Sequence, residues 1–266
     1  MEDRLVNDVL TYNEWLLCSE LRPQADVRLF CFPYAGGNAQ IYRNWSKQIN
    51  ENVEVVAVNL PGHGNRIMEP PISRLDILIR KTVEAIYSYL VEKPFVFFGH
   101  SMGALISFEI MRYIFSEYGL KPEHLFVSAY RAPQLNTKIT QPKNMHLSDT
   151  ELIEELKEMN GTPEWVFEND EVMQIFLPVI RADMEVCKTY LYSDEFPINV
   201  PITAFGGNKD KRVSLSEVEK WKEQTAKFKM EVIQGDHFFI HDMETKITSN
   251  INDELRNLCH VGGKLQ

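Results

Sequence analysis

The sequence predicts an α/β protein in which a mostly parallel central sheet carries helices on both faces. Short apolar runs rich in Val, Ile and Phe alternate along the chain with longer amphipathic stretches of helical period. Because parallel strands need crossover connections, this alternation places helices on both sides of one sheet. The length of 266 residues is that of one large domain, or of a domain with a modest insertion.

Six apolar runs are predicted to form buried strands of this sheet: Val27–Phe32, Val53–Val58, Phe95–Phe98, Leu125–Ser128, Ile202–Phe205 and Met230–Ile233. Two stretches between them, Leu75–Leu90 and Ala104–Ile114, have apolar residues at the spacing of an amphipathic helix. The first two dozen residues, which include Trp15-Leu16-Leu17, are predicted to form a short helix or an arm.

A helical insertion is predicted between the fourth and fifth of these strands, where about seventy residues lack a strand pattern. The sequence Ser148-Asp149-Thr150-Glu151 has the form of a capping box and opens a helix that runs through Met159. A second helical stretch covers Glu171–Tyr190, with Pro178 as a candidate kink. We expect one domain, with a core of about residues 26–132 and 197–262 and a helical lid of about residues 133–196.

Composition and charge argue against several classes of protein. The formal net charge of −10 is the opposite of the basic footprint that nucleic-acid binding needs. Four widely spaced cysteines (Cys18, Cys31, Cys187 and Cys259) fit neither a disulfide scaffold nor a zinc pattern, and indicate a reducing compartment. The acidic start is unlike a signal peptide, and no apolar run approaches the ~18 residues of a membrane span. We therefore expect a cytoplasmic protein that binds no nucleic acid, membrane or metal ion.

The motif Gly99-His100-Ser101-Met102-Gly103 predicts a nucleophilic serine. G-x-S-x-G alone arises by chance in on the order of one in ten chains of this length. Here it follows an apolar run and precedes a helical pattern, which is the context of a nucleophile elbow. The glycines are expected to allow close approach of strand and helix around a strained Ser101. The alternative is an ordinary strand–helix turn in which Ser101 caps the helix.

An acid and a base for Ser101 are expected downstream, in the chain order of α/β-hydrolases. Asp210 follows the fifth predicted strand, and His237 follows the sixth strand and a glycine. Asp236 is a rival acid, but adjacent residues seldom orient each other's side chains, so Asp210 is preferred. The other histidines, at positions 63, 100, 124, 146, 241 and 260, are interpreted as surface or packing residues, and His100 is expected to point away from Ser101.

Two backbone N–H groups are predicted to stabilise an oxyanion. The first apolar run ends in Pro33-Tyr34-Ala35-Gly36-Gly37, a glycine-rich turn from which the Ala35 N–H can face a developing negative charge. The second donor is the N–H of Met102, directly after the serine. A further turn, Leu60–Arg66, is interpreted as structural, with contact between Arg66 and an anionic substrate as the alternative.

Together these residues resemble the type II thioesterases that accompany nonribosomal peptide and polyketide synthases, members of the α/β-hydrolase superfamily. The matching segments are LFCFPYAGG at 29–37, LPGHGNR at 60–66, FFGHSMG at 97–103, GGNKDKRV at 206–213, GDHF at 235–238 and, in the insertion, GTP at 161–163 and LPVIRAD at 177–183. The sequence departs from the family pattern at His63, where many members carry Arg, and at Asn208, where an acidic residue is common. The resemblance implies an α/β-hydrolase fold with Ser101, Asp210 and His237 as the catalytic triad.

The resemblance further implies an editing enzyme that hydrolyses acyl or aminoacyl thioesters from the phosphopantetheine arm of carrier proteins. The arm belongs to the substrate, so no cofactor is expected. Two other hydrolases fit the same motifs, a medium-chain acyl-carrier-protein hydrolase of fatty-acid synthesis and a free-standing carboxylesterase. A non-catalytic binding partner with a hydrolase fold is a different class, against which the full set of Ser101, Asp210 and His237 argues.

The implied partner is an acyl or peptidyl carrier domain of a synthase. This protein is expected to bind it as a monomer. Such domains are expected to be acidic, and this chain is acidic too, so net charge cannot steer docking. The insertion offers apolar candidates for the contact: Met159, Trp165, Phe167, Met173, Ile175 and Phe176. Most of them are expected to pack the lid onto the core, with one or two left at the opening.

Overall fold

One mixed sheet organises the molecule. The computed structural model describes residues 5–6, 9–137, 147–159, 161–194, 199–256 and 258–261. Within them nine strands pair in the order β1-β2-β3-β5-β4-β6-β7-β8-β9. Their bounds are β1 Leu5–Val6, β2 Val9–Asn13, β3 Leu16–Cys18, β4 Val27–Phe32, β5 Val53–Val58, β6 Phe95–His100, β7 Leu125–Ser128, β8 Ile202–Gly207 and β9 Phe228–Ile233. The six predicted strands are all present, and they form the parallel part of the sheet.

The helices of the described residues include all four for which the sequence predicts bounds, at 75–90, 104–114, 148–159 and 171–190, and others for which it predicts none. Their bounds are α1 Leu75–Leu90, α2 Met102–Tyr118, α3 Asp149–Met159, α4 Glu164–Phe167, α5 Asp170–Lys188, α6 Leu215–Glu219, α7 Phe239–Asp242, α8 Glu244–Leu255 and α9 Leu258–Val261. Helix α2 is longer than predicted because it starts directly after Ser101 and ends at Gly119, whose φ of 67° terminates the last turn. The single turn α4 was not predicted, since four residues are too few to show a period.

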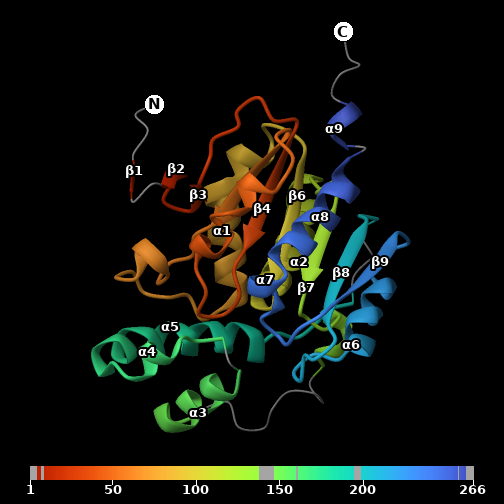
Figure 1. The fold of residues 1–266 in the computed structure, drawn as a ribbon. Helices are drawn as coiled ribbons and strands as arrows, with labels where there is room; N and C mark the ends of the chain where they lie inside the picture. Colours follow the sequence, from red (N-terminus) through yellow and green to blue (C-terminus); the bar gives the residue numbers. More distant parts are fainter. Residues whose placement is uncertain are drawn as a thin grey trace.

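Side chains alternate along the strands between two apolar cores, one on each face of the sheet. Phe30, Phe97 and Val127 pack with α1 and α2, whereas Leu29, Phe98 and Phe126 pack with α7 and α8. All six residues of each of β4, β5 and β6 are buried, as expected for parallel strands that are covered on both faces. The prediction of a mostly parallel sheet with helices on both faces is confirmed (Figure 1).

The N-terminal segment is where the prediction was wrong in part. Helix formation was one of its two predicted forms, but its described residues form antiparallel strands β1 to β3, and β3 pairs with β5 through Leu16↔Val58 and Leu17↔Ala57. The residues of β3 are all buried, because this short strand extends the sheet and lies under its neighbours. The apolar run was therefore a strand that is covered on both faces, which periodicity alone does not distinguish from a helix.

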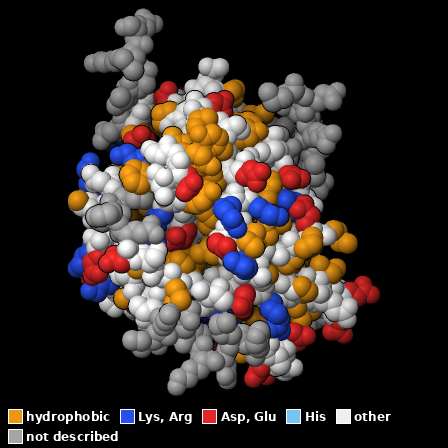
Figure 2. Space-filling model, turned by 180° about the vertical axis from the view of Figure 1, so that it is seen from behind, with side chains coloured by type: hydrophobic (Ala, Val, Ile, Leu, Met, Phe, Trp, Pro, Cys, Tyr) orange, Lys and Arg blue, Asp and Glu red, His pale blue; other side chains and the backbone are white. Residues whose placement is uncertain are grey.

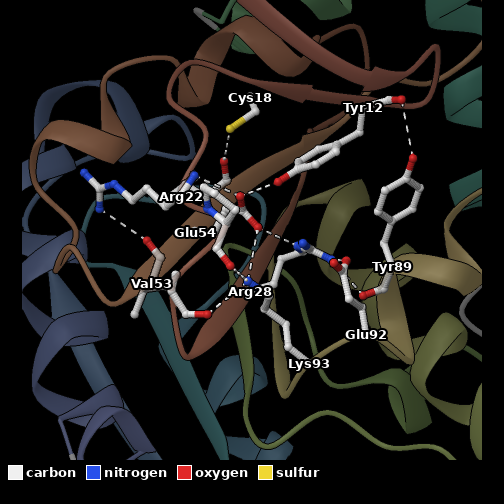
Figure 3. A network of polar contacts seen from close by, with 12 residues as sticks. Tyr12, Cys18, Arg22, Arg28, Val53, Glu54, Tyr89, Glu92 and Lys93 are labelled. Carbon is white, nitrogen blue, oxygen red and sulfur yellow. Dashed lines mark hydrogen bonds and ion pairs between the residues drawn. The ribbon is translucent and has the colours of Figure 1, made fainter. Parts of the chain in front are cut away.

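A polar network attaches this segment to the amino ends of the parallel strands (Figure 3). Arg28 on β4 and Glu54 on β5 are paired in register and form a buried ion pair, with 2.8 Å between Arg28 Nε and Glu54 Oε2. Glu54 also accepts hydrogen bonds from the Tyr12 hydroxyl and from the backbone N–H of Arg22. Arg28 Nη1 contacts Glu92 at 2.8 Å, so the guanidinium has an acidic partner on each side.

The insertion lies between β7 and β8 and contributes α3, α4 and α5 (Figure 1). The capping box at its start is confirmed, since Ser148 and Glu151 exchange side-chain and backbone hydrogen bonds at the start of α3. The second predicted helix is present as α5, and Pro178 lies inside it. Leu152 and Leu156 of α3 pack on Ile180 of α5 in a third, small apolar cluster. Within the described residues no strand forms in this region, as predicted.

Candidate active site

Ser101 lies at the sharp turn between β6 and α2. Its backbone angles of φ 52° and ψ −119° are strained for a residue that has a side chain. The Ser101 N–H donates a hydrogen bond of 2.7 Å to the carbonyl oxygen of Ser128, which attaches the turn to the end of β7. The geometry is that of a nucleophile elbow at the carboxyl edge of the sheet.

The two glycines of the motif have the steric role that the sequence predicts. A Cβ atom on Gly99 would lie 2.1 Å from the carbonyl oxygen of Gly103, and one on Gly103 would lie 2.0 Å from the carbonyl oxygen of Phe32. Both distances are far below van der Waals contact, and the opposing atoms belong to the backbone. Any other residue at either position would push the elbow away from the sheet.

Two loops bring a histidine and an acid to Ser101. His237, after β9, places Nε2 2.9 Å from Ser101 Oγ, and its Nδ1 lies 2.8 Å from Asp210 Oδ2. Asp210, after β8, uses its other oxygen to accept hydrogen bonds from the backbone N–H of Arg212 and Val213. Because the carboxylate can only accept, the Nδ1–H of His237 donates, and Nε2 is left as an acceptor for the serine proton.

The environment keeps Asp210 ionised. Burial alone would raise the pKa of Asp210, but the hydrogen bond and charge of His237 and the two backbone N–H donors outweigh it, so the pKa lies below its ordinary value. Asp236 lies outside this arrangement. It is exposed, and its Oδ1 accepts a hydrogen bond of 2.9 Å from the Phe238 N–H. The preference for Asp210 over Asp236 thus agrees with the geometry.

His100 holds the backbone of His237 in place, a role that the sequence analysis did not predict. Its ring is fully buried, with Nδ1 2.9 Å from the Ser128 hydroxyl and Nε2 2.8 Å from the carbonyl oxygen of His237. Burial and the nearby His237 lower the pKa of His100 to about 3, so the ring is neutral. Its Nε2–H therefore donates to the backbone of His237 and fixes the position of that residue.

Of the two predicted oxyanion residues, Met102 directly follows the serine and Ala35 lines the same cavity as Ser101. Met102 is the first residue of α2, so its N–H has no acceptor in the hydrogen-bond ladder of the helix. The Gly37 N–H donates to the Tyr34 carbonyl oxygen at 2.9 Å, and Gly36 has φ 74°. Ala35 is not among the described residues with positive φ, so residues 34–37 form a type II turn.

Besides His100, the expectation that the other histidines are surface or packing residues is correct for two and wrong for one. His124 stacks on Phe126, and His241 contacts the Tyr34 hydroxyl. His63 instead forms a buried ion pair with Asp183 of α5, at 2.8 Å between Nε2 and Oδ2. His146 and the side chain of His260 lie outside the described residues.

In the turn Leu60–Arg66, which contains His63, Arg66 has a structural role, as predicted. The Arg66 guanidinium is buried, donates to Glu69 and to the carbonyl oxygen of Asn59, and lies over the Trp15 ring. These contacts occupy the side chain and hold the N-terminal segment, which leaves the alternative of an anion contact without support.

A cavity of about 690 Å³ opens above Ser101 and His237. The core contributes Ala35 and Phe238, and the insertion contributes Leu156, Met159, Trp165, Val166, Phe176, Ile180 and Met184. The insertion thus forms the apolar wall that faces the elbow. Such a space suits an acyl chain, since apolar walls with a few polar groups are typical of small-molecule sites.

The apolar residues of the insertion divide as the sequence predicts. Met173 is buried, and Met159, Phe167 and Phe176 are partly buried. Trp165 and Ile175 are 59% and 50% exposed, and Trp165 also lines the cavity. Trp165 therefore lies where the cavity meets solvent.

The described residues offer neither a metal site nor a membrane-spanning helix. Among them no group of three or more His, Cys, Asp or Glu side chains is placed to hold a metal ion. Likewise, none of the helices formed by the described residues combines the length and the apolar character that crossing a membrane requires. The four cysteines are free.

A serine on a strained strand–helix turn, with a histidine and an acid on loops after later parallel strands, defines an α/β-hydrolase. Comparison with known proteins gives the family. The family model described as "Thioesterase domain" matches residues 27–255. The chain therefore belongs to the thioesterase family, and within it to the type II thioesterases of nonribosomal peptide and polyketide pathways.

Individual relatives cover nearly the whole chain. The gramicidin S biosynthesis protein GrsT of Aneurinibacillus migulanus is 41% identical over 92% of this chain and 94% of its own length. The linear gramicidin dehydrogenase LgrE of Brevibacillus parabrevis is 42% identical over the same shares. Its name denotes a different reaction, but the present sequence contains no G-x-G-x-x-G fingerprint of a dinucleotide site. The structure of the type II thioesterase BorB from the borrelidin biosynthetic cluster superposes with a TM-score of 0.81, at 33% identity over 91% of this chain and 98% of that one.

Proposed function

We propose that this enzyme removes acyl and aminoacyl groups from the phosphopantetheine arm of carrier proteins through an acyl-enzyme on Ser101. The observation that carries the proposal is the pair of hydrogen bonds from Ser101 to His237 and from His237 to Asp210. Type II thioesterases act on carrier-bound substrates of synthases. Removal of wrong or stalled groups would return such carriers to use.

In the first half of the reaction the Ser101 hydroxyl attacks the thioester carbonyl carbon while His237 Nε2 accepts its proton. Asp210 holds the ring in the tautomer that has a free Nε2 and stabilises the charge that the ring gains. The carbonyl oxygen becomes an oxyanion, and the N–H groups of Ala35 and Met102 are the proposed donors to it. When the C–S bond breaks, the thiolate leaves and is protonated from His237.

The second half repeats these roles with water. His237 takes a proton from water, the resulting nucleophile attacks the Ser101 ester, and the serine oxygen leaves and regains the proton. A thiol with a pKa of ~8.5 is a better leaving group than an amine, so acid catalysis at departure is less demanding than in a protease. Besides water, the steps use only groups of the chain and of the substrate.

Carrier docking is proposed to use apolar contact around Trp165 and Ile175. Both side chains are exposed on the insertion, and Trp165 also reaches the cavity. The chain and its expected carrier are both acidic, so their overall fields repel. Acidic and basic side chains are interspersed on the face shown in Figure 2. Carrier turnover should therefore hold or rise with moderate salt, which screens the repulsion.

A matched pair of variants tests this docking. Trp165→Ser should lose more turnover on an acyl-carrier substrate than on the same acyl group carried by pantetheine. Val91→Ser is the control, because Val91 is also about half exposed but lies between the end of α1 and the amino end of β6, outside the lining of the cavity. Equal loss on both substrates, or a steep fall of carrier turnover with salt, would contradict apolar docking at the insertion.

The reaction itself is tested by release of free thiol from acyl-carrier substrates of different chain length, with oxygen esters as control. We expect thioester turnover together with labelling of Ser101 by a serine-directed phosphonate. A sharp optimum at medium-chain fatty acyl groups would instead support the fatty-acid alternative, and preference for oxygen esters would support a carboxylesterase. Absence of thiol release from every carrier substrate would contradict the proposal.

We further propose that the enzyme works as a cytoplasmic monomer. Ser101, Asp210 and His237 come from one chain, so a second copy has nothing to add to them. The free cysteines agree with a reducing compartment. Sedimentation at working concentration tests the monomer, and fractionation of the producing cells tests the location.

A further inference from the structure

Asp183 connects the insertion to the turn that carries Ala35. It lies on α5, is only 2% exposed, and its Oδ2 accepts a hydrogen bond of 2.7 Å from the Gly36 N–H. One turn earlier on the same helix, Ile180 packs so closely on the turn that a Cβ at Gly36 would lie 3.2 Å from Ile180 Cγ1. Helix α5 therefore lies directly against this turn.

The same carboxylate oxygen holds His63. His63 Nε2 lies 2.8 Å from Asp183 Oδ2, and His63 Nδ1 lies 3.0 Å from the carbonyl oxygen of Pro61. A carbonyl oxygen can only accept, so Nδ1 carries a hydrogen and donates it. With Asp183 ionised, Nε2 must carry a hydrogen as well. The geometry is thus that of a buried imidazolium paired with a carboxylate.

This pair determines which way the central peptide of the turn points. In the type II turn of residues 34–37, the peptide between Ala35 and Gly36 directs its N–H at Asp183. A flip to a type I turn would exchange that N–H for the Ala35 carbonyl oxygen, which the carboxylate repels. Asp183 thus selects one of two turns and anchors the peptide that directly follows Ala35. The Ala35 N–H, the proposed oxyanion donor, belongs to the preceding peptide, so the anchor fixes the position of that donor relative to Ser101.

We propose that Asp183 and His63 are positioning residues that hold the 34–37 turn, and with it the Ala35 N–H, in the position required to stabilise the oxyanion. Neither residue touches the reacting atoms: His63 holds the Asp183 side chain in place, and Asp183 holds the turn in place. The inference rests on the proposed role of Ala35 in the reaction at Ser101. It also gives α5 a second role besides forming a wall of the cavity.

The pair responds to pH through His63. The charge of Asp183 and its hydrogen bond outweigh burial and raise the pKa of His63 above its ordinary value. Two other titratable groups on the packed elements, Cys187 on α5 and Tyr34 on the turn, have pKa values raised by burial to about 12 and stay neutral. The remaining charged side chains on these elements are Asp170, Glu171, Arg181, Glu185 and Lys188 on α5 and Arg66 after His63. The imidazolium is therefore fully present below the ordinary value and is lost as pH rises through the raised pKa of His63.

Asp183→Asn in the full chain tests the role of the carboxylate. With an acyl-pantetheine substrate, kcat should fall about tenfold or more, because misplaced donors stabilise the transition state poorly, while KM should change less than twofold. Labelling of Ser101 by a phosphonate should slow in parallel, since its P–O group occupies the oxyanion site. Binding of a non-hydrolysable thioether analogue should be unchanged.

Glu171→Gln is the matched control, because it makes the same chemical change at an exposed position of α5. Circular dichroism and thermal unfolding report whether each variant is folded at the assay temperature. An unchanged kcat in folded Asp183→Asn, or equal losses of kcat and of analogue affinity, would overturn the inference. Failure of the proposed function is a separate result, seen as full turnover by Ser101→Ala or as no labelling of Ser101 in the unsubstituted enzyme.

Two substitutions of His63 test its charge. His63→Arg supplies a permanent positive charge, and His63→Gln supplies a donor without charge, so neither titrates near neutral pH. In the unsubstituted enzyme, kcat should fall at alkaline pH as His63 deprotonates. This alkaline limb of the pH profile of kcat should be absent from each His63 variant that folds. At neutral pH His63→Arg should retain more kcat than His63→Gln. An alkaline limb that persists unchanged would overturn the role of His63.

Discussion

Two buried ion pairs lie at opposite ends of the same sheet and differ in what they can do. Arg28–Glu54 lies at the amino ends of β4 and β5, and its guanidinium keeps its charge at every physiological pH. His63–Asp183 lies beyond the carboxyl ends, between a loop, the insertion and the turn at Ala35. The Arg28–Glu54 pair can therefore contribute to the stability of the fold alone. In the His63–Asp183 pair the imidazole can gain or lose its charge next to the proposed reaction site.

The surroundings of the two pairs show the same difference. Glu54 is fully buried and is contacted by Arg28, Tyr12 and the Arg22 N–H, all from elements that the sheet holds in place (Figure 3). At the other end, the backbone of Gly36 and of Ser101 has a positive φ angle. Substitutions at the carboxyl ends of the strands should therefore lower activity and leave the fold intact. Substitutions at the amino ends should lower the free energy of unfolding and leave activity intact.

The largest effect on activity should come from Ser101→Ala. Without the hydroxyl no acyl-enzyme can form, and loss of a triad serine costs on the order of 10⁶ in turnover in a well-studied protease. Free-thiol release measures the loss, and the temperature of unfolding should stay close to that of the unsubstituted protein. A variant that keeps a tenth of the original rate would contradict the assignment of the nucleophile.

Asp210→Asn should give the next largest loss, roughly 10⁴-fold by analogy with a triad aspartate, because an amide favours the wrong tautomer of His237. Asp236→Asn is the natural control, since Asp236 contacts the Phe238 N–H and not the imidazole of its neighbour. Both variants are compared by kcat on one acyl-pantetheine substrate. If Asp236→Asn were the more damaging change, the acid would be misassigned.

These residues could be predicted because their signals are local in the chain. The elbow is defined by Gly99 and Gly103 within five residues, and the acid and base each follow a strand pattern that an apolar run reveals. The parallel part of the sheet was predictable for the same reason, since strands buried on both faces form continuous apolar runs.

The features that were missed depend on partners far apart in sequence. His63 and Asp183 are 120 residues apart, so nothing near either one indicates an ion pair. His100 bonds to the backbone of His237, a contact that leaves no trace in residue types. The strands before residue 19 were ambiguous because their apolar residues show no clear period and pair only through tertiary contact.

At the amino end, Glu54→Gln should lower the free energy of unfolding by about 3–5 kcal/mol, because it leaves the buried Arg28 without its main counter-charge. Glu20→Gln is the control: it also removes a carboxylate that pairs with an arginine, but that side chain is 54% exposed and should matter by less than about 1 kcal/mol. Chemical denaturation measures both. The kcat of folded Glu54→Gln should equal that of the unsubstituted enzyme, and a large fall in kcat would break the contrast between the two ends.

The smallest expected effect is the pH dependence of stability that the His63–Asp183 pair contributes. Because the pKa of His63 is raised in the folded state, the folded protein holds this proton more tightly than the unfolded chain does. The contribution is therefore fully present below the unfolded value of ~6.5 and is lost as pH rises through the raised folded value. Unfolding by denaturant across this range should show a decline at alkaline pH that His63→Arg removes, and its size should be below the loss in Glu54→Gln. The Arg28–Glu54 pair should add no such decline, because its guanidinium does not titrate there. A decline of equal size in His63→Arg would show that another group is responsible, and the two buried pairs would then no longer differ in their response to pH.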